Sequence, residues 1–132
     1  MPHGHVLVVE DDDTIRRLVI QILEERALHV DGARDGADAL HQLSRQQYGV
    51  VILDLMMPFM SGIDFLDSLN VLLFDPTLKS IQQPPAVLVM TSAAEDAVPS
   101  SDLERRFPMV RGVIRKPLDV RDLTMRIDQL LR

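Results

Sequence analysis

The sequence contains no cysteine and no apolar run long enough to cross a membrane. Without cysteine, the chain has neither disulfides nor thiolate chemistry, so any site must be built from oxygen and nitrogen groups. A membrane helix needs about 20 consecutive apolar residues. The first ten residues, MPHGHVLVVE, also lack the basic segment and long apolar stretch of a secretion signal. We therefore expect a cytoplasmic protein without membrane contacts.

Positive charge is scarce over most of the chain. Residues 1–104 hold 17 acidic and 6 basic residues, whereas residues 105–132 hold 3 acidic and 8 basic ones. Nucleic-acid-binding proteins usually carry a clustered excess of lysine and arginine, so the net charge of −6 predicts no direct nucleic-acid binding. The arginines of the basic end have two equally good interpretations: they form either an ordinary solvated surface or a docking surface for a protein partner. They are Arg105, Arg106, Arg111, Arg115, Arg121 and Arg126.

Strand-like and helix-like patterns alternate along the chain, whose 46% hydrophobic and 26% charged residues are typical of a globular domain. Continuous apolar runs are typical of strands buried on both faces. They predict strands at 6–9, 50–53 and 86–90. Another strand is expected near 110–114 and a weaker one near 28–33. Apolar residues at helical spacing predict helices at about 13–26, 36–46, 62–73 and 120–131.

This alternation predicts a three-layer α/β fold with a five-stranded parallel sheet, because each parallel connection needs a long crossover. The fifth helix belongs between the last two strands, where Pro99 interrupts it. Residues 75–85 form a proline-bearing connection. We expect residues 1–132 to form one domain, since the length leaves no room for a second.

Polar residues follow four of the predicted strands, at the edge where ligands bind in open α/β sheets. They are Glu10 and Asp11, Asp54, Thr91, and Lys116. Two carboxylates about 4 Å apart repel by roughly 4 kcal/mol at an effective dielectric constant near 20. Mg²⁺ relieves such repulsion because it prefers oxygen ligands. The lysine ammonium and the threonine hydroxyl suit the oxygens of a phosphoryl group, and Asp54 lies where a nucleophile belongs.

Four segments at these strand ends resemble the signature blocks of response regulator receiver domains of two-component signal transduction, in family order: VLVVEDDDTIRR, VVILDLMMPFMSG, VLVMTSA and VIRKP. The resemblance covers nearly the whole chain. Within the family, the chain is most similar in type to single-domain receivers such as those of chemotaxis. It implies a doubly wound, flavodoxin-like sheet with strand order 2-1-3-4-5.

The resemblance also implies a function. A phosphohistidine donor transfers a phosphoryl group to Asp54 in a Mg²⁺-dependent reaction, which switches a protein-interaction surface. The expected partners are a sensor histidine kinase or a histidine phosphotransfer protein, and a downstream protein target. Such a domain is not an enzyme, because it catalyses only its own phosphorylation and slow dephosphorylation.

Individual roles follow from the same resemblance. Asp54 is the expected phosphoacceptor, Lys116 the lysine that pairs with the phosphoryl group, and Thr91 the switch hydroxyl. The Lys116–Pro117 peptide is expected to be cis. The implied Mg²⁺ ligands are Glu10, Asp11, Asp54 and the backbone carbonyl of Met56.

Three positions depart from the family pattern. Val113 stands where the family has a rotating aromatic residue, which puts the usual coupling of hydroxyl and aromatic movement in doubt. Met56 and Ala93 lack the polar side chains that help position a hydrolytic water in similar domains. We therefore expect a longer-lived aspartyl phosphate, because nothing orients the attacking water.

Several other polar or sulfur-containing residues have simpler explanations. Asp12 and Asp13 precede a predicted helix, which favours N-capping over metal binding. Met56, Met57 and Met60 are expected to pack against neighbours, since thioether sulfur suits copper(I) rather than Mg²⁺. No ligand spacing, and hence no role, is evident for His3, His5, His29 and His41.

Three alternatives compete with the phosphoacceptor interpretation. A phosphatase or phosphotransferase with an aspartate nucleophile would usually have a second aspartate where this chain has Met56. A flavodoxin-type cofactor binder would have its phosphate repelled by Glu10 and Asp11. A degenerate receiver acting as a phosphorylation-independent protein-binding module is left open by Val113 and Met56, although the retained acids and Lys116 argue against it.

Overall fold

Five parallel strands form one sheet in the computed structural model, which describes residues 4–57, 59–73, 84–92 and 100–132. The strands are β1 (His5–Val9), β2 (His29–Ala33), β3 (Val50–Asp54), β4 (Ala86–Thr91) and β5 (Val110–Arg115). Their order across the sheet is β2-β1-β3-β4-β5. This confirms the predicted α/β class and the doubly wound strand order.

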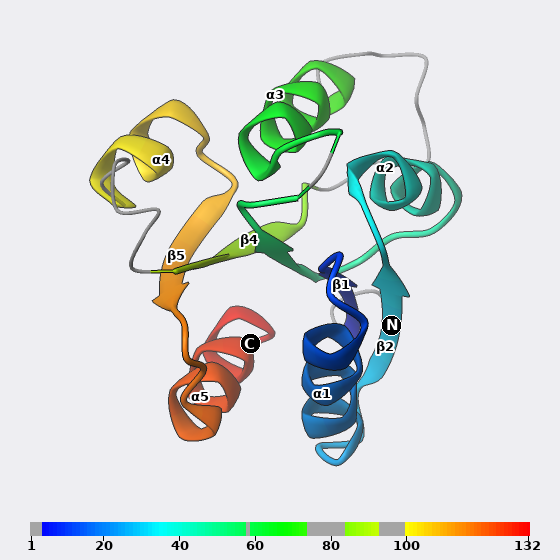
Figure 1. Cartoon of the computed structure of the whole chain (residues 1–132), viewed down its shortest axis with the longest axis vertical. Coiled ribbons are helices and arrows are strands. Elements are labelled where there is room, and N and C mark those ends of the chain that lie inside the picture. The colour runs from blue at the N-terminus through cyan, green and yellow to red at the C-terminus, as the bar shows by residue number, and fades with distance from the viewer. Residues whose placement is uncertain (1–3, 58, 74–83, 93–99) are drawn as a thin grey trace.

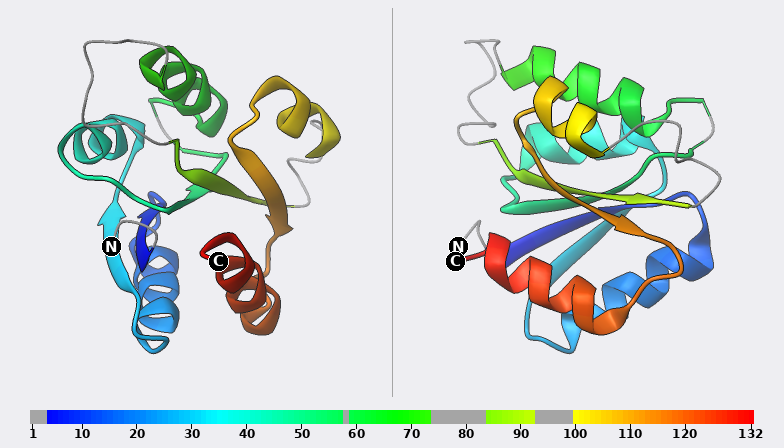
Figure 2. Two further views of the ribbon diagram at one scale, coloured as in Figure 1. Left: turned by 180° about the vertical axis from the view of Figure 1, so that it is seen from behind. Right: turned by 90° about the vertical axis from the view of Figure 1, so that its left-hand side faces the viewer.

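The helices cover both faces of this sheet, as the side view in Figure 2 shows. They are α1 (Asp13–Glu24), α2 (Gly36–Arg45), α3 (Gly62–Leu73), α4 (Ser100–Arg106) and α5 (Val120–Leu130). In Figure 1, α1 and α5 lie on one face and α2, α3 and α4 on the other. The three predicted layers are confirmed. No helix among the described residues is long and apolar enough to span a membrane.

Each face of the sheet has its own apolar core. Phe65 and Leu66 of α3 pack with the side chains of α2 and α4 on one face. Val19 of α1 and Leu123 of α5 belong to the core on the other face. Every residue of β3 is buried, whereas the edge strands β2 and β5 keep partly exposed positions. The uninterrupted apolar run at 50–53 reflects this burial on both faces.

Aspartates begin three of the helices. The side chains of Asp12, Asp35 and Asp119 accept hydrogen bonds from backbone N–H groups in the first turns of α1, α2 and α5. The N-capping role predicted for Asp12 is confirmed, whereas Asp13 is the first residue of α1. Helix α4 begins immediately after Pro99. Most of the proline-bearing connection at 75–85 lies outside the described residues.

Gly62 joins the loop after β3 to helix α3 and permits a close backbone approach. A Cβ atom at this position would lie 2.7 Å from the Leu55 Cα and 2.9 Å from the Asp54 carbonyl oxygen. Alanine normally stabilises a helix relative to glycine, but here we expect Gly62→Ala to reduce the free energy of unfolding by about 1–3 kcal/mol through overpacking. Denaturant unfolding measures this difference. Gly4→Ala is the matched control, because a Cβ there meets nothing within 4 Å; equal stability of both variants would contradict the prediction.

Candidate functional site

Three carboxylates meet at the carboxyl end of the central strands. Glu10 directly follows β1, and Asp54 is the last residue of β3, the neighbouring strand in the sheet. One carboxylate oxygen from each of Glu10, Asp11 and Asp54 lies within 4.8 Å of the other two. Glu10 and Asp54 are only 1% and 2% exposed, whereas Asp11 is exposed to solvent. The arrangement brings together the three acidic residues that the sequence predicted for a Mg²⁺ site.

Among the residues that the structure describes, Lys116 is the base that pairs with these carboxylates. It follows β5, and its Nζ lies 3.0 Å from Glu10 Oε1 and 3.4 Å from Asp54 Oδ1. Burial opposes the charge of this ammonium, but the hydrogen bond to Glu10 and the charges of Asp54 and Glu10 outweigh burial and raise the pKa of Lys116. The lysine is therefore held protonated beside the carboxylate that the sequence singled out as a nucleophile.

One ammonium does not compensate three carboxylates. Burial raises the pKa of Glu10, and the nearby Asp54 adds to this effect, although Lys116 acts in the opposite direction. Burial and the neighbouring Glu10 also raise the pKa of Asp11. The oxygen donor set and its excess of negative charge fit Mg²⁺, which prefers carboxylate, carbonyl and water ligands.

Backbone and side-chain donors hold the two buried acids in place. The Asp12 N–H lies 3.4 Å from Glu10 Oε2, and Arg16 Nη1 donates to the Glu10 carbonyl oxygen at 2.9 Å. The Met56 N–H donates to Asp54 Oδ1 at 3.3 Å. Asp54 Oδ1 therefore faces two donors, the Met56 amide and the Lys116 ammonium.

Thr91 ends β4 beside the end of β3. It is 5% exposed, and its preceding residue Met90 pairs with Asp54 in the parallel register. The Lys116 N–H donates to the Thr91 carbonyl oxygen at 2.7 Å, which ties the residue after β5 to the end of β4. The hydroxyl-bearing residue, the lysine and the phosphoacceptor candidate thus occupy adjacent strand ends.

The loop after Asp54 departs from one prediction. Met57 is buried and Met60 packs against the core, as expected, but the Met56 side chain is 63% exposed. The packing predicted for Met56 is wrong: its N–H donates to Asp54, while its side chain lies in solvent. The side chain of Met56 is therefore accessible to an approaching partner.

Three further predictions concern the chain around the site. The Lys116–Pro117 peptide is cis, as expected. Val113 is half-buried and packs against the core on the face of α2, α3 and α4. Ala93 lies outside the described residues.

The arginines of the basic end are partly engaged with acids of the same chain. Arg105 pairs with Asp102, and Arg126 with Asp122, within their own helices. Arg106 of α4 reaches Asp67 of α3 at 3.2 Å. These pairs lower the net positive charge that α4 and α5 present to a partner.

Among the described residues, sequence reasoning missed one cluster of possible metal ligands, formed by His5, His29 and Asp31 at the opposite end of the sheet. His29 and Asp31 are two residues apart on β2, while His5 is on β1. The i, i+2 spacing within one strand was the only signal available, and it does not reveal which strand lies alongside.

Mg²⁺ is expected to stabilise the folded chain. At a concentration 100 times its Kd, a ligand that binds only the folded state adds about 2.7 kcal/mol. The protonated forms of Glu10 and Asp11 favour folding at low pH, since their pKa values are raised, and this contribution is lost as the pH rises through those values. The Mg²⁺-induced rise in melting temperature should therefore grow as the pH is raised from 4 to 7.

Asp11→Asn provides the test of this prediction. We expect the variant to lose most of the Mg²⁺-induced rise in melting temperature, while its metal-free stability at neutral pH equals or exceeds that of the unaltered chain. Asp13→Asn is the control, because Asp13 is turned to its ion pair with Arg16 and should retain the Mg²⁺ response. An equal Mg²⁺ response in Asp11→Asn and the unaltered chain would contradict the assignment of Asp11.

Nearly the whole chain matches a known protein family. The profile of the family described as response regulator receiver domain matches residues 6–128. The response regulator receiver protein CpdR of Brucella abortus is 31% identical over 127 residues, which cover 96% of this chain and 95% of that protein. The chain spans about half of the length, 53% and 49%, of two other curated relatives, which are named as transcriptional regulatory proteins.

Solved structures of receiver domains and response regulators have folds similar to that of this chain. A CheY-like response regulator receiver domain protein from Methanospirillum hungatei is 29% identical, with a TM-score of 0.79, and the match covers 98% of this chain and 94% of that one. The response regulator TrrA of Thermotoga maritima, in complex with Mg²⁺-BeF, is 25% identical with a TM-score of 0.74. That match covers 96% of this chain and 97% of TrrA.

Proposed function

The chain belongs to the response regulator receiver domain family of two-component signalling, whose members are phosphoacceptor modules rather than true enzymes; on this basis, we propose that Asp54 accepts a phosphoryl group from a phosphohistidine donor with the help of Mg²⁺. The observation that carries the proposal is the buried Asp54 carboxylate, with Lys116 Nζ 3.4 Å from its Oδ1 and Glu10 and Asp11 beside it.

The proposed step is a phosphoryl transfer between two side chains. A carboxylate oxygen of Asp54 forms a bond to phosphorus, the P–N bond of the donor phosphohistidine breaks, and the bonding electron pair leaves with the imidazole nitrogen. Lys116 and the hydroxyl of Thr91 would stabilise the negative charge on the phosphoryl oxygens. The Met56 N–H, which donates to Asp54 Oδ1, would hold the carboxylate in one orientation.

The residues proposed to hold Mg²⁺ are Glu10, Asp11, Asp54 and the Met56 backbone carbonyl. Receiver domains bind Mg²⁺, and the TrrA structure is a complex with Mg²⁺-BeF. The bound ion would supply positive charge that offsets the carboxylates and the incoming phosphoryl oxygens. Glu10 is braced by Lys116 and the Asp12 N–H, which supports a role in fixing the position of this charge.

The proposed partners follow from the family. Receiver domains partner with histidine kinases, and we propose a sensor histidine kinase or a histidine phosphotransfer protein as the donor. The proposed output is a change in a protein-interaction surface on α4, β5 and α5, read by a downstream protein. Since Val113 replaces an aromatic residue, that change would travel through Thr91 and the backbone of β4 and β5, which are joined by the hydrogen bond from the Lys116 N–H to the Thr91 carbonyl.

The test is incubation of the chain with a small phosphodonor, acetyl phosphate, in the presence of Mg²⁺ or of a chelator. Intact-mass spectrometry should find one added phosphoryl group only when Mg²⁺ is present, and peptide mapping should locate it on the segment containing Asp54. No adduct under any condition would instead favour the phosphorylation-independent binding module, and an adduct on another segment would reject Asp54.

The phosphoryl group is also expected to be long-lived. Met56 presents an exposed thioether next to Asp54, where it has no polar group to orient a water molecule. We expect the double variant Met56→Asn/Ala93→Glu to lose its aspartyl phosphate about tenfold faster, because the new polar groups would orient the attacking water. This is less than the roughly 10²–10⁴-fold that a full general acid or base contributes. Decay is followed by intact mass after removal of the phosphodonor. The conservative variant Met56→Leu should decay at the original rate; an unchanged rate in the double variant would contradict this explanation.

A further inference from the structure

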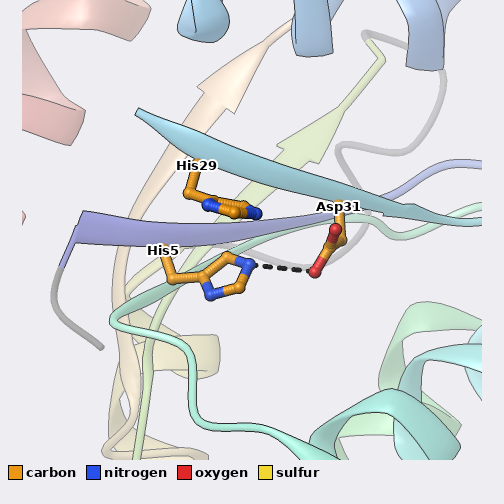
Figure 3. Close-up of side chains that lie close together, drawn as sticks. All are labelled: His5, His29 and Asp31. Atoms are coloured by element: carbon orange, nitrogen blue, oxygen red, sulfur yellow. Dashed lines mark hydrogen bonds and ion pairs between the residues drawn. The ribbon is translucent and has the colours of Figure 1, made fainter. Parts of the chain in front are cut away.

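A second group of metal-ligating side chains lies at the amino-terminal end of the sheet. His5 and His29 are the first residues of β1 and β2, and the parallel register pairs them directly. Asp31 is two residues after His29 and therefore lies on the same face of β2. Figure 3 shows His5, His29 and Asp31 gathered at the start of these two strands.

The distances suit a common ligand. One nitrogen of each histidine and one oxygen of Asp31 all lie within 4.8 Å of one another. His5 Nε2 is 2.9 Å from Asp31 Oδ2, and the two imidazole rings have centroids 4.4 Å apart. Ligands of tetrahedral zinc lie about 3.3 Å from one another, given bond lengths near 2.0–2.1 Å. Small side-chain rotations would therefore bring the three atoms to coordinating distance.

Two neighbouring side chains orient the cluster. The hydroxyl of Tyr48, a residue only 4% exposed, donates to Asp31 Oδ2 at 2.7 Å. The terminal amide of Gln46 lies 2.5 Å from His5 Nδ1. The same amide lies 2.7 Å from His5 Nε2, so it must turn toward Nδ1 before Nε2 can meet an ion. Because the oxygen and nitrogen of an amide can exchange places by rotation, the Gln46 oxygen can then accept a hydrogen bond from the Nδ1–H group and favour the tautomer whose Nε2 binds a metal. Metal-binding histidines and carboxylates usually have such supporting hydrogen bonds.

The cluster is also open and favourably charged. His29 is exposed, while His5 and Asp31 are half-buried, so an ion can reach them from solvent. Within the described part of the chain, no lysine or arginine forms an ion pair with Asp31, whose side chain is hydrogen-bonded to His5 and Tyr48. Glu10 lies five residues after His5, which corresponds to about 16 Å of extended chain and separates this cluster from the acidic site at the other end of β1.

We propose that His5, His29 and Asp31 bind a divalent transition-metal ion of the zinc class. Two imidazoles and one carboxylate suit Zn²⁺ better than Mg²⁺, which prefers oxygen ligands alone. The ion replaces the hydrogen bond between His5 and Asp31 and leaves its remaining coordination position to water. It joins the edge strand β2 to β1 and so stabilises the least buried side of the sheet.

The experiment is calorimetric titration of the full chain with Zn²⁺ while Mg²⁺ is saturating, so that the acidic site is occupied. We expect one Zn²⁺ to bind, and His29→Ala to weaken its affinity at least tenfold. His29 is exposed, so this variant should keep its fold, which thermal unfolding without zinc verifies. Asp31→Asn should also weaken binding at least tenfold, and Tyr48→Phe by roughly ten- to a hundredfold through loss of a supporting hydrogen bond.

Two histidine substitutions serve as controls. His41→Ala on the exposed surface of α2, and His3→Ala, should leave the affinity unchanged. In NMR spectra, Zn²⁺ should shift the ring resonances of His5 and His29 and not those of His41. Unaltered affinity in His29→Ala, or loss of binding in His3→Ala alone, would overturn the proposal.

Discussion

Asp54→Asn is expected to abolish the phosphorylated species formed with Mg²⁺ and acetyl phosphate. The amide is nearly the same size as the carboxylate and can still accept the hydrogen bond from the Met56 N–H, so the fold should persist. It lacks the negatively charged oxygen that must attack phosphorus. It also removes one of the three carboxylates gathered at this end of the sheet. Intact-mass spectrometry should therefore detect no adduct.

The matched control for this variant is Asp12→Asn. Asp12 caps helix α1 through its side chain, and asparagine is an equally good N-cap, so the substitution should preserve the helix. We expect Asp12→Asn to be phosphorylated to the same extent as the unaltered chain. An adduct that persists in Asp54→Asn would reject Asp54 as the phosphoacceptor, and loss of the adduct in Asp12→Asn would place Asp12 in the site.

Lys116→Met is expected to slow phosphorylation by about 100-fold. Removing one preorganised donor from the site of charge development typically costs a factor of 10²–10³ in rate, and Lys116 is the ammonium beside both Asp54 and Glu10. The methionine side chain fills a similar volume but carries no charge. Rates of adduct formation at several phosphodonor concentrations would separate slower transfer from weaker binding.

Stability supplies a second measurement on the same variant. Without Lys116, the buried Glu10 carboxylate loses a hydrogen bond and its counter-charge, which should lower the free energy of unfolding by about 1–3 kcal/mol at neutral pH. The loss should shrink as the pH falls, because a protonated Glu10 needs no counter-charge. Lys79→Met, which changes the only other lysine of the sequence, is the control. Equal phosphorylation rates in the two variants would contradict the role proposed for Lys116.

The two proposed metal sites differ in their ligand atoms and in the ions that they fit. The acidic site combines Glu10, Asp11 and Asp54 and fits a hard ion, whereas the histidine cluster fits a softer one. They lie at opposite ends of β1, so the Mg²⁺ response and the Zn²⁺ response should be separable by Asp11→Asn and His29→Ala. Stabilisation by both ions together should be close to additive, as it is for distant sites.

Much of the fold could be predicted because its signals are local. A buried parallel strand exposes neither face, so β3 appears as an unbroken apolar run, and a helix that covers a sheet needs an apolar stripe at helical spacing. Helix α3 was predicted with its observed bounds, while α1 ends at Glu24, two residues before the predicted end. The end of a helix depends on its capping residues and on the turn that follows it. In the turn after α1, Ala27 adopts a positive φ of 61°, which the apolar pattern of the sequence does not predict.

The acidic site could also be predicted, for a topological reason. The carboxyl ends of parallel strands lie at the same edge of the sheet. Residues immediately after the strands therefore lie close together there, independently of how the side chains of the core pack. The sequence by itself therefore determined the α/β class, the position of Glu10, Asp54 and Lys116 at one edge, and the excess of negative charge among them.

Only the tertiary structure decided which atoms meet. Lys116 lies closer to Glu10 than to Asp54, and Met56 turns its side chain to solvent, because these contacts depend on loop paths and rotamers rather than on strand order. The pairing of His5 with His29 depends on which strand lies beside β1 and in what register. Register is set by the packing of whole strands and helices against the core, a long-range property that no local pattern in the sequence contains.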